Sequence, residues 1–490
     1  MRNAAEDSMS RRLIPLLALA LAACEPTGTS NDDGTTLVDA NVDEVLSDNN
    51  DATTTNEDEW DTSNTVNITL SGSTASADGN GVDISGNTVT ITRSGVYYVS
   101  GTLNGQLVVD AGSEDIVAIV LDGASITNGS DAALVVLAAD DVAVHLAEGS
   151  TNSLTDTASF GDADVNATLF SEEDLTISGT GSLSIRGSND GITSEDDLVL
   201  LGGTISVVAA DDCLRGKDAL VVEGGSFTLE CGGDALKSDN DDDATRGYVY
   251  LRGGTIVGNA GDDGIDAYTD AIIADGSFTI AAADDGIHPD NTLLIAGGTV
   301  DITQSYEGLE AFNISITGGD ISVVADDDGV NGSGGDGGWG DTGEFVSISG
   351  GTLFVDADGD GLDSNGSFEM TGGEVTVFGP SGNGNGALDT DGSLEVQGGT
   401  LLAIGSASMV ESPDDSSEQP WLALTLSSTI SANKEVVVVD SSGTEVERFT
   451  STKSFASIVF SSADIVDGAT YTVQVDGQTV GSVAAGTAAS

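Results

Sequence analysis

The chain of 490 residues contains very few basic residues. Its 13 Lys and Arg stand against 82 Asp and Glu, which gives a formal net charge of -69. This charge repels phosphate groups, so the composition excludes nucleic acid and anionic membrane surfaces as binding partners. A surplus of carboxylates either attracts divalent cations or reflects a saline habitat, and composition leaves both explanations open.

Histidine, cysteine and aromatic residues are also scarce. His145 and His288 are the only histidines, and Cys213 and Cys231 are far from either, so no zinc-binding set can be assembled. Those two cysteines can form a disulfide in an oxidising compartment, but their spacing does not establish it. Aromatics make up 4% of the chain, which disfavours a broad sugar-stacking platform. No nucleophile elbow, phosphate loop or HExxH motif is present.

Residues 1–24 have the features of a lipoprotein signal peptide. Arg11 and Arg12 precede a short apolar run that ends in Leu-Ala-Ala-Cys, with Cys24 as the predicted site of lipidation. We therefore expect an exported lipoprotein of the outer membrane or cell surface; the alternative is an ordinary secretory signal with a chance cysteine. Residues 25–62 are polar and acidic without periodicity, which predicts an acidic flexible linker.

An internal repeat of about 22 residues runs through the middle of the chain. Each copy has an acidic residue, then a small residue and a branched apolar residue, as in Asp285-Gly-Ile and Asp328-Gly-Val. A glycine pair follows in most copies, flanked by short stretches in which apolar and polar residues alternate. A repeat of this length cannot bury its apolar face alone, but stacked copies can.

This pattern predicts an all-β fold: a right-handed parallel β-helix, a solenoid of ~22-residue coils, over residues 63–408. The leucine-rich repeat signature is absent, and a propeller blade needs about forty residues. Residues 409–490 contain longer strands with ordinary turns, which predict a small C-terminal β module that caps the open end.

Stacking would place the acidic residues of successive copies above one another. Two carboxylates ~4.8 Å apart repel by about 0.9 kcal/mol in water and about 3.5 kcal/mol at an effective dielectric near 20. No Lys or Arg occurs from Gly253 to Asn433 to offset this repulsion. Bound Ca²⁺ is the simplest cofactor to predict, because it accepts six to eight oxygen ligands. The alternative is a solvated acidic face without bound metal. The candidate metal ligands are Asp263, Asp266, Asp285, Glu307, Glu310, Asp328, Asn331 and Asp360.

Two insertions occur at the same position of the repeat, at 239–246 and 332–343. In a solenoid the same repeat position means the same side, so we expect this side to bind ligand. Asp356-x-Asp358-x-Asp360 resembles half of an EF-hand loop and lacks the Glu that would complete it. The candidate ligand-binding residues are Trp339, Asp239, Asp241, Asp242 and His288.

Several motifs, among them Asp284-Asp-Gly-Ile-His288, Tyr306-Glu-Gly-Leu-Glu310 and Asp327-Asp-Gly-Val-Asn331, resemble a bacterial carbohydrate-binding domain family. The resemblance covers about residues 85–485. It implies a calcium-binding parallel β-helix, related in fold to pectate lyases, that binds cellulose or acidic glycans such as polygalacturonate. It favours a non-catalytic, calcium-dependent polysaccharide-binding surface lipoprotein, which we expect to be a monomer. A polysaccharide lyase and a structural or adhesive surface protein are the alternatives.

Overall fold

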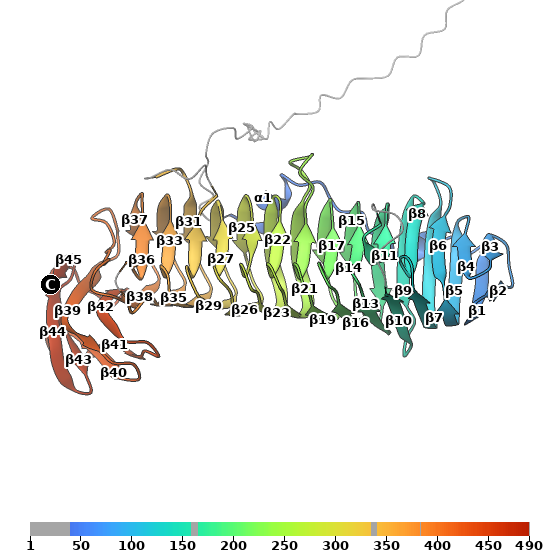
Figure 1. The fold of residues 1–490 in the computed structure, drawn as a ribbon. Coiled ribbons are helices and arrows are strands. Elements are labelled where there is room, and N and C mark those ends of the chain that lie inside the picture. The colour runs from blue at the N-terminus through green and yellow to red at the C-terminus, as the bar shows by residue number, and fades with distance from the viewer. Residues whose placement is uncertain (1–39, 158–164, 335–340, 383, 490) are drawn as a thin grey trace, which may run out of the picture. The chain divides into compact units, whose positions relative to one another are not determined.

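The computed structural model describes residues 40–157, 165–334, 341–382 and 384–489. These residues are almost entirely β (Figure 1). The described part has one short α-helix, α1 (Val42–Leu46), and one 3-10 turn, η1 (Glu57–Glu59). No helix in it is long and apolar enough to cross a lipid bilayer.

Most strands belong to three parallel sheets that run the length of the repeat region, and each coil contributes one short segment to each sheet. Four long strands bend from sheet 1 into sheet 2: β5 (Gly95–Asn104), β7 (Ile116–Asn128), β21 (Tyr248–Asn259) and β23 (Asp270–Ala281). The other strands of sheet 1 are β9 (Asp141–Leu146), β12 (Asp174–Gly179), β15 (Asp197–Leu200), β18 (Ala219–Val222), β25 (Thr292–Ile295), β28 (Asn313–Ile316), β31 (Phe345–Ile348), β34 (Ser367–Met370) and β37 (Leu394–Val396).

Sheet 2 continues with β10 (Thr151–Asp156), β13 (Ser182–Arg186), β16 (Thr204–Val208), β19 (Ser226–Glu230), β26 (Thr299–Gln304), β29 (Asp320–Ala325), β32 (Thr352–Ala357), β35 (Glu374–Phe378) and β38 (Thr400–Gly405). Sheet 3 contains β4 (Thr88–Ile91), β6 (Gln106–Asp110), β8 (Leu134–Ala138), β11 (Ala167–Ser171), β14 (Asp190–Ser194), β17 (Leu214–Gly216), β20 (Leu236–Ser238), β22 (Ile265–Ala267), β24 (His288–Pro289), β27 (Leu309–Ala311), β30 (Val330–Gly332), β33 (Leu362–Ser364) and β36 (Leu388–Thr390). A bridge between Ile287 and Leu309 carries sheet 3 from β24 to β27.

The predicted stacking of successive coils is present in the strand register. In sheet 1, Leu293 lies beside Ile314 and Ile314 beside Val346, each in parallel pairing. These side chains point inward and belong to one continuous apolar core that runs through the coils. The period of the sequence therefore fixes which residues become neighbours in space.

The glycine markers are explained by the turns between sheets. Gly298 has a φ of +80°, a backbone conformation that favours glycine, and it forms the turn from sheet 1 to sheet 2. Gly286, which follows Asp285, lies so close to the next coil that a Cβ would be 2.4 Å from the carbonyl oxygen of Gly308. Glycine is thus required both at the turn and beside the acidic residue.

The two ends of the solenoid are covered by antiparallel strands. At the N-terminal end, β1 (Thr65–Gly72) pairs with β2 (Ala75–Ala77), and β3 (Val82–Ser85) pairs with β4. At the other end, β42 (Phe455–Ser461) pairs antiparallel with both β38 and β39 (Trp421–Ile430). The remaining C-terminal strands are β40 (Glu435–Val439), β41 (Glu445–Thr450), β43 (Thr470–Val475), β44 (Gln478–Ala484) and β45 (Thr487–Ala489).

The prediction of a flexible linker over residues 25–62 is wrong for residues 40–62, which we call the strap. The strap lies along the outer surface of sheet 1 instead of extending into solvent. Val45 is buried against Ile272 and Leu294, and farther along the strap Trp60 packs on Val120 and its neighbours. The backbone N–H of Thr53 donates to Asp197 Oδ2 at 2.7 Å, and that of Thr55 donates to Thr176 Oγ1 at 2.9 Å.

The outer surface of sheet 1 is apolar where the strap covers it. Strand register aligns one outward position of every coil, and from β18 to β25 this column reads Val221, Tyr250, Ile272 and Leu294. Beyond the strap the same column becomes polar, with Ser315, Ser347, Glu369 and Glu395. The apolar residues of the column thus form the docking surface of the strap.

Candidate functional site

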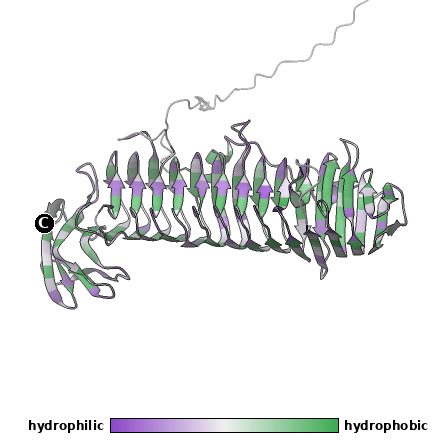
Figure 2. Ribbon diagram, in the orientation of Figure 1, coloured by the Kyte–Doolittle hydropathy of each residue, from purple (hydrophilic) through white to green (hydrophobic). Residues whose placement is uncertain are grey.

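Two columns of mainly acidic side chains run along sheet 3. The anchor column lies in the turn that enters each strand, and it consists of Asp190, Asp212, Asp234, Asp263, Asp285, Glu307, Asp328 and Asp360. The outer column is the middle residue of each three-residue strand and the first residue of the two-residue β24, and it consists of Arg215, Lys237, Asp266, His288, Glu310, Asn331, Asp363 and Asp389. Because alternate residues of a strand point to opposite faces, these middle side chains point outward. In Figure 2 the short strands of sheet 3 carry a row of hydrophilic ribbon segments that repeats from coil to coil.

The anchor column is a hydrogen-bonded ladder. Asp234 Oδ1 accepts the backbone N–H of Asp263 at 2.9 Å, and Asp263 Oδ1 accepts that of Asp285 at 2.8 Å. The ladder continues from Asp285 to the N–H of Glu307 at 3.1 Å. Farther along, Asp328 accepts the N–H of Asp360 at 2.5 Å, and Asp360 accepts that of Gly386. Backbone donors therefore compensate part of the repulsion that the sequence had led us to assign entirely to an external cation.

Burial raises the pKa of many of these carboxyl groups. Burial, together with the charges of Asp263 and Glu307, raises the pKa of Asp285 to about 6. Burial likewise raises the pKa of Asp328 to about 7 and that of Asp363 to about 8, again with the help of neighbouring acids. A cation bound beside these groups would favour their ionised forms.

Several acids of the region are paired with basic side chains of the protein. Arg215 Nε donates to both carboxylate oxygens of Asp239 at 3.0 Å, so this predicted ligand-binding residue already has a partner. Lys237 Nζ bridges Asp234 and the predicted metal ligand Asp266, 2.8 Å from Asp266 Oδ2. These two partners make Asp239 and Asp266 weaker candidates than the sequence indicated.

Lys453, from the C-terminal strands, reaches the motif that resembles half of an EF-hand. Its Nζ lies 2.8 Å from Asp356 Oδ1 and 2.9 Å from Asp358 Oδ1, and it also donates to the carbonyl oxygen of Ala357. A lysine ammonium thus neutralises two of the three carboxylates of this motif. The predicted ligand Asp360 lies in the ladder instead.

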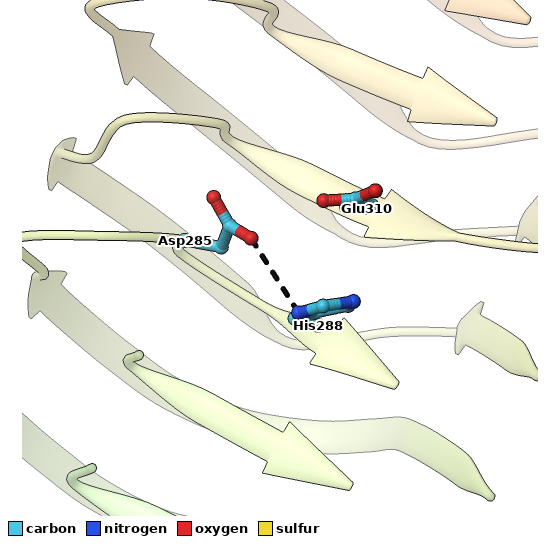
Figure 3. A group of neighbouring side chains, drawn as sticks. All are labelled: Asp285, His288 and Glu310. Atoms are coloured by element: carbon cyan, nitrogen blue, oxygen red, sulfur yellow. Dashed lines mark ion pairs between the residues drawn. The ribbon is translucent and has the colours of Figure 1, made fainter. Parts of the chain in front are cut away.

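Asp285, His288 and Glu310 form one cluster across two coils (Figure 3). One ligand atom from each side chain lies within 4.8 Å of the other two. His288 Nδ1 is 3.5 Å from Asp285 Oδ2 and 3.8 Å from Asp263 Oδ2. Asp263 and the other surrounding carboxylates raise the pKa of His288 to about 9, which favours the cationic imidazole at neutral pH. His288 therefore serves this part of the columns as a counter-ion.

A second cluster contains only oxygen ligands: Asp262, Asp263 and Asp284 each offer an oxygen within 4.8 Å of the others. Sequence reasoning had passed over Asp262 and Asp284, although each directly precedes an anchor residue and forms an acidic doublet with it. This acidic doublet could have identified Asp262 and Asp284 as candidate ligands from the sequence. Carboxylate oxygens in such a group are the donors that Ca²⁺ prefers.

Oxygen donors also gather around Asn331. Its Nδ2 donates to Glu307 Oε2 at 2.7 Å, whereas its buried Oδ1 has no hydrogen-bond partner among the described residues. Strand register places Asn331 beside Glu310. Burial, together with the nearby Glu310, raises the pKa of Glu307 to about 7. An unpartnered acceptor among carboxylates fits a cation with oxygen ligands.

The remaining predicted residues fall into two groups. Asp241 and Asp242 are exposed in the insertion at 239–246, consistent with access to a ligand. Trp339 and Cys24 lie outside the described residues. The pairing that the sequence left open is settled in the structure, where Cys213 and Cys231 form a disulfide between neighbouring coils.

Comparison with known proteins identifies the family. A family model described as "Carbohydrate-binding domain-containing protein" matches residues 85–329 and 281–485, which together span most of the chain. This chain belongs to that family. A family member of the same description from Acetivibrio thermocellus is 46% identical over 194 residues, which is 38% of this chain and 68% of the relative.

Among solved structures, the chain is similar to a polysaccharide lyase-like protein from C. thermocellum, determined as a gadolinium derivative. The identity is 33%, and the match covers 47% of this chain and 96% of the other, with a TM-score of 0.46. The family's description refers to binding of carbohydrate and names no reaction.

Proposed function

We propose that this member of the carbohydrate-binding family is a non-catalytic surface lipoprotein that binds an acidic polysaccharide with the help of Ca²⁺. Its coils would form a right-handed parallel β-helix, and Cys24 would attach it to the membrane. The observation that carries the proposal is the gathering of oxygen donors along one side of sheet 3, in a chain whose family is named for carbohydrate binding.

The donor sets suit Ca²⁺ unequally. Asp262, Asp263 and Asp284 supply oxygens only, as do Glu307, Glu310 and Asn331. The imidazole of His288 is a nitrogen donor, and Ca²⁺ prefers oxygen, so we assign His288 to charge compensation rather than to the calcium ligands. Bound Ca²⁺ would supply positive charge, through which an anionic protein can hold an anionic sugar.

A polysaccharide lyase would require a basic side chain beside the cation. Lys237 is the nearest in the columns, and it bridges two carboxylates. Arg215 is likewise held between Glu195 and Asp239. These ion pairs favour binding over catalysis, because both groups neutralise acids of the protein.

Two measurements test the proposal. Ca²⁺ should raise the Tm of the EDTA-treated protein, since a ligand that binds only the native state stabilises it by about 2.7 kcal/mol at a hundred times its Kd. The variant Asp263→Asn with Asp284→Asn should lose most of this increase, whereas Asp83→Asn, an exposed residue of β3, should keep it. Asparagine retains the oxygen that accepts the ladder hydrogen bond.

Glycan binding is measured by retention on immobilised polygalacturonate and on cellulose, with Ca²⁺ and with EDTA. Retention on polygalacturonate that EDTA abolishes supports the proposal. Retention that EDTA does not change removes the calcium requirement, and an absence of retention on either glycan favours the structural or adhesive alternative. Growth of the ultraviolet absorbance of unsaturated uronates during incubation would identify a lyase.

A further inference from the structure

Two exposed tyrosines flank the acidic columns on opposite sides of the sheet 3 strands. Tyr306 directly precedes the anchor Glu307, and 48% of its surface is exposed. Tyr268 directly follows β22 and is 42% exposed. Exposed large aromatic side chains are unusual in this chain, where most are core residues. Their position beside the outer column therefore calls for an explanation.

Tyr306 replaces an acid in a column of acids. Its backbone N–H donates to the carbonyl of Asp284 at 2.7 Å, and its own carbonyl accepts the N–H of Asp327 at 2.8 Å. The position before the anchor is thus aspartate in the coils on either side. The Asp327 side chain lies close to the Tyr306 phenol and raises its pKa to about 12. The ring consequently lies next to carboxylates of the column without entering the core.

Tyr268 lies in the bend that follows β22, two residues after Asp266, and its side chain is exposed on this flank of sheet 3. The Cβ atom of Tyr268 is next to Gly247, the residue that follows the insertion at 239–246; a Cβ on that glycine would be 3.0 Å away. Two coils farther on, Phe312 occupies the equivalent position after Glu310, and it is half-buried. The second flank of the columns therefore also carries aromatic rings.

The coils of Tyr268 and Tyr306 are two apart, which corresponds to about 10 Å along the solenoid axis at ~4.8 Å per coil. The outer-column residues between them are Asp266, His288 and Glu310. A pyranose ring has an apolar face that stacks on an aromatic ring, and its hydroxyl and carboxylate groups remain free at the edges. The two rings and the polar strip between them thus have the composition of a sugar-binding surface.

We propose that Tyr268 and Tyr306 are the stacking residues of a glycan site in which an extended polysaccharide chain crosses the outer column between them. The inference rests on the proposed function and names its specificity-determining residues. The rings contact two separate sugars of one chain, while Ca²⁺ held by the acids of the columns bridges the uronate carboxylates between them. A short oligosaccharide reaches only one tyrosine, so longer chains bind more tightly.

The test compares Tyr268→Ala, Tyr306→Ala and the double variant with Tyr98→Ala. Tyr98, in β5 of sheet 1, is 41% exposed and lies away from sheet 3, so it is a matched control. Affinity for polygalacturonate and for its oligosaccharides of increasing length is measured in Ca²⁺ by titration calorimetry. Each single substitution should weaken binding of the long chain about tenfold, and Tyr98→Ala should leave it unchanged.

The outcomes separate this inference from the function on which it depends. If the wild-type protein does not bind the glycan, the proposed function fails. If the wild type binds and both alanine variants bind equally well, the assignment of the two tyrosines is wrong while the function stands. Tyr306→Phe separates stacking from an effect on folding, because it keeps the ring and loses only the hydroxyl group. It should retain binding, and a loss as large as that of Tyr306→Ala would refute stacking.

Discussion

Replacing Asp328 by Ala and by Asn separates the two roles of the anchor column. The Asp328 carboxylate accepts the backbone N–H of Asp360 at 2.5 Å, and it also repels the acids around it. Alanine removes both the charge and the acceptor. Asparagine removes the charge and keeps an oxygen at the same position.

The magnitudes can be worked out from this geometry. A buried N–H left without an acceptor costs about 1–3 kcal/mol. Removing one of two carboxylates ~4.8 Å apart relieves between about 0.9 and 3.5 kcal/mol, depending on the local dielectric. Both substitutions relieve the repulsion between carboxylates, and only alanine loses the acceptor of the buried N–H. Asp328→Ala should therefore be about 1–3 kcal/mol less stable than Asp328→Asn, whatever the strength of the repulsion.

Urea unfolding at pH 7.5 in EDTA, followed by circular dichroism, measures this difference. We expect Asp328→Asn to equal or exceed the wild type in free energy of unfolding, because no cation compensates the charge under these conditions. Equal stabilities of the Ala and Asn variants would refute the ladder. A marked loss in Asp328→Asn would show that the negative charge itself stabilises the metal-free protein.

Three further predictions follow from the same contacts. Burial raises the pKa of Asp328 and Asp363 above their unfolded values, and neighbouring carboxylates raise the pKa of His288. The stability that these groups contribute is therefore full below about pH 4 and is lost as the pH rises through about 7 to 9. Unfolding in EDTA across this range measures the loss, and a stability that rises toward pH 8 would contradict the prediction. Val45→Asp should release the strap, because the lost apolar burial costs about 1.5–3 kcal/mol. The release is measured as faster hydrogen exchange and proteolysis of residues 40–60. Asp43→Asn, at an exposed position, is the control, and unchanged exchange in Val45→Asp would refute the prediction. Lys453→Met leaves Asp356 and Asp358 without their ammonium partner, so it should lower the Tm in EDTA. It should also increase the rise in Tm caused by Ca²⁺. An unchanged response to Ca²⁺ would show that these carboxylates bind no cation.

The stacking could be predicted because residues one repeat apart in the sequence become neighbours in adjacent coils of a solenoid. Once the coil length is known, Asp285 must lie between Asp263 and Glu307, and the outer column follows three residues later. The hydrogen bonds of the ladder could not be predicted in the same way, because their donors are backbone groups that every residue possesses. The contact of Lys453 with Asp356 was equally inaccessible, since the two residues lie far apart in the sequence and meet only through the packing of the C-terminal strands.

The strap was missed because its own sequence is mostly polar, and its docking surface lies far along the chain. A signal was nevertheless present in the partner strands. A strand with one buried face alternates apolar and polar residues, whereas β23 begins Asp-Ala-Ile-Ile and β25 reads Thr-Leu-Leu-Ile. Such continuous apolar runs indicate burial on both faces. The sequence thus indicated that the outer face of sheet 1 is covered, but it did not identify the segment that covers it.

The coil of Glu307 departs from its neighbours at several positions that the stacking brings together. Its anchor is glutamate where most coils have aspartate, and the preceding residue is Tyr306 where both neighbours have aspartate. The longer side chain reaches Asn331 of the next coil and contacts Glu310 of its own. A repeat maintained only for folding has no reason to change at all these positions in one coil. Their coincidence beside Asp285 and His288 supports the proposal that a ligand binds at this coil.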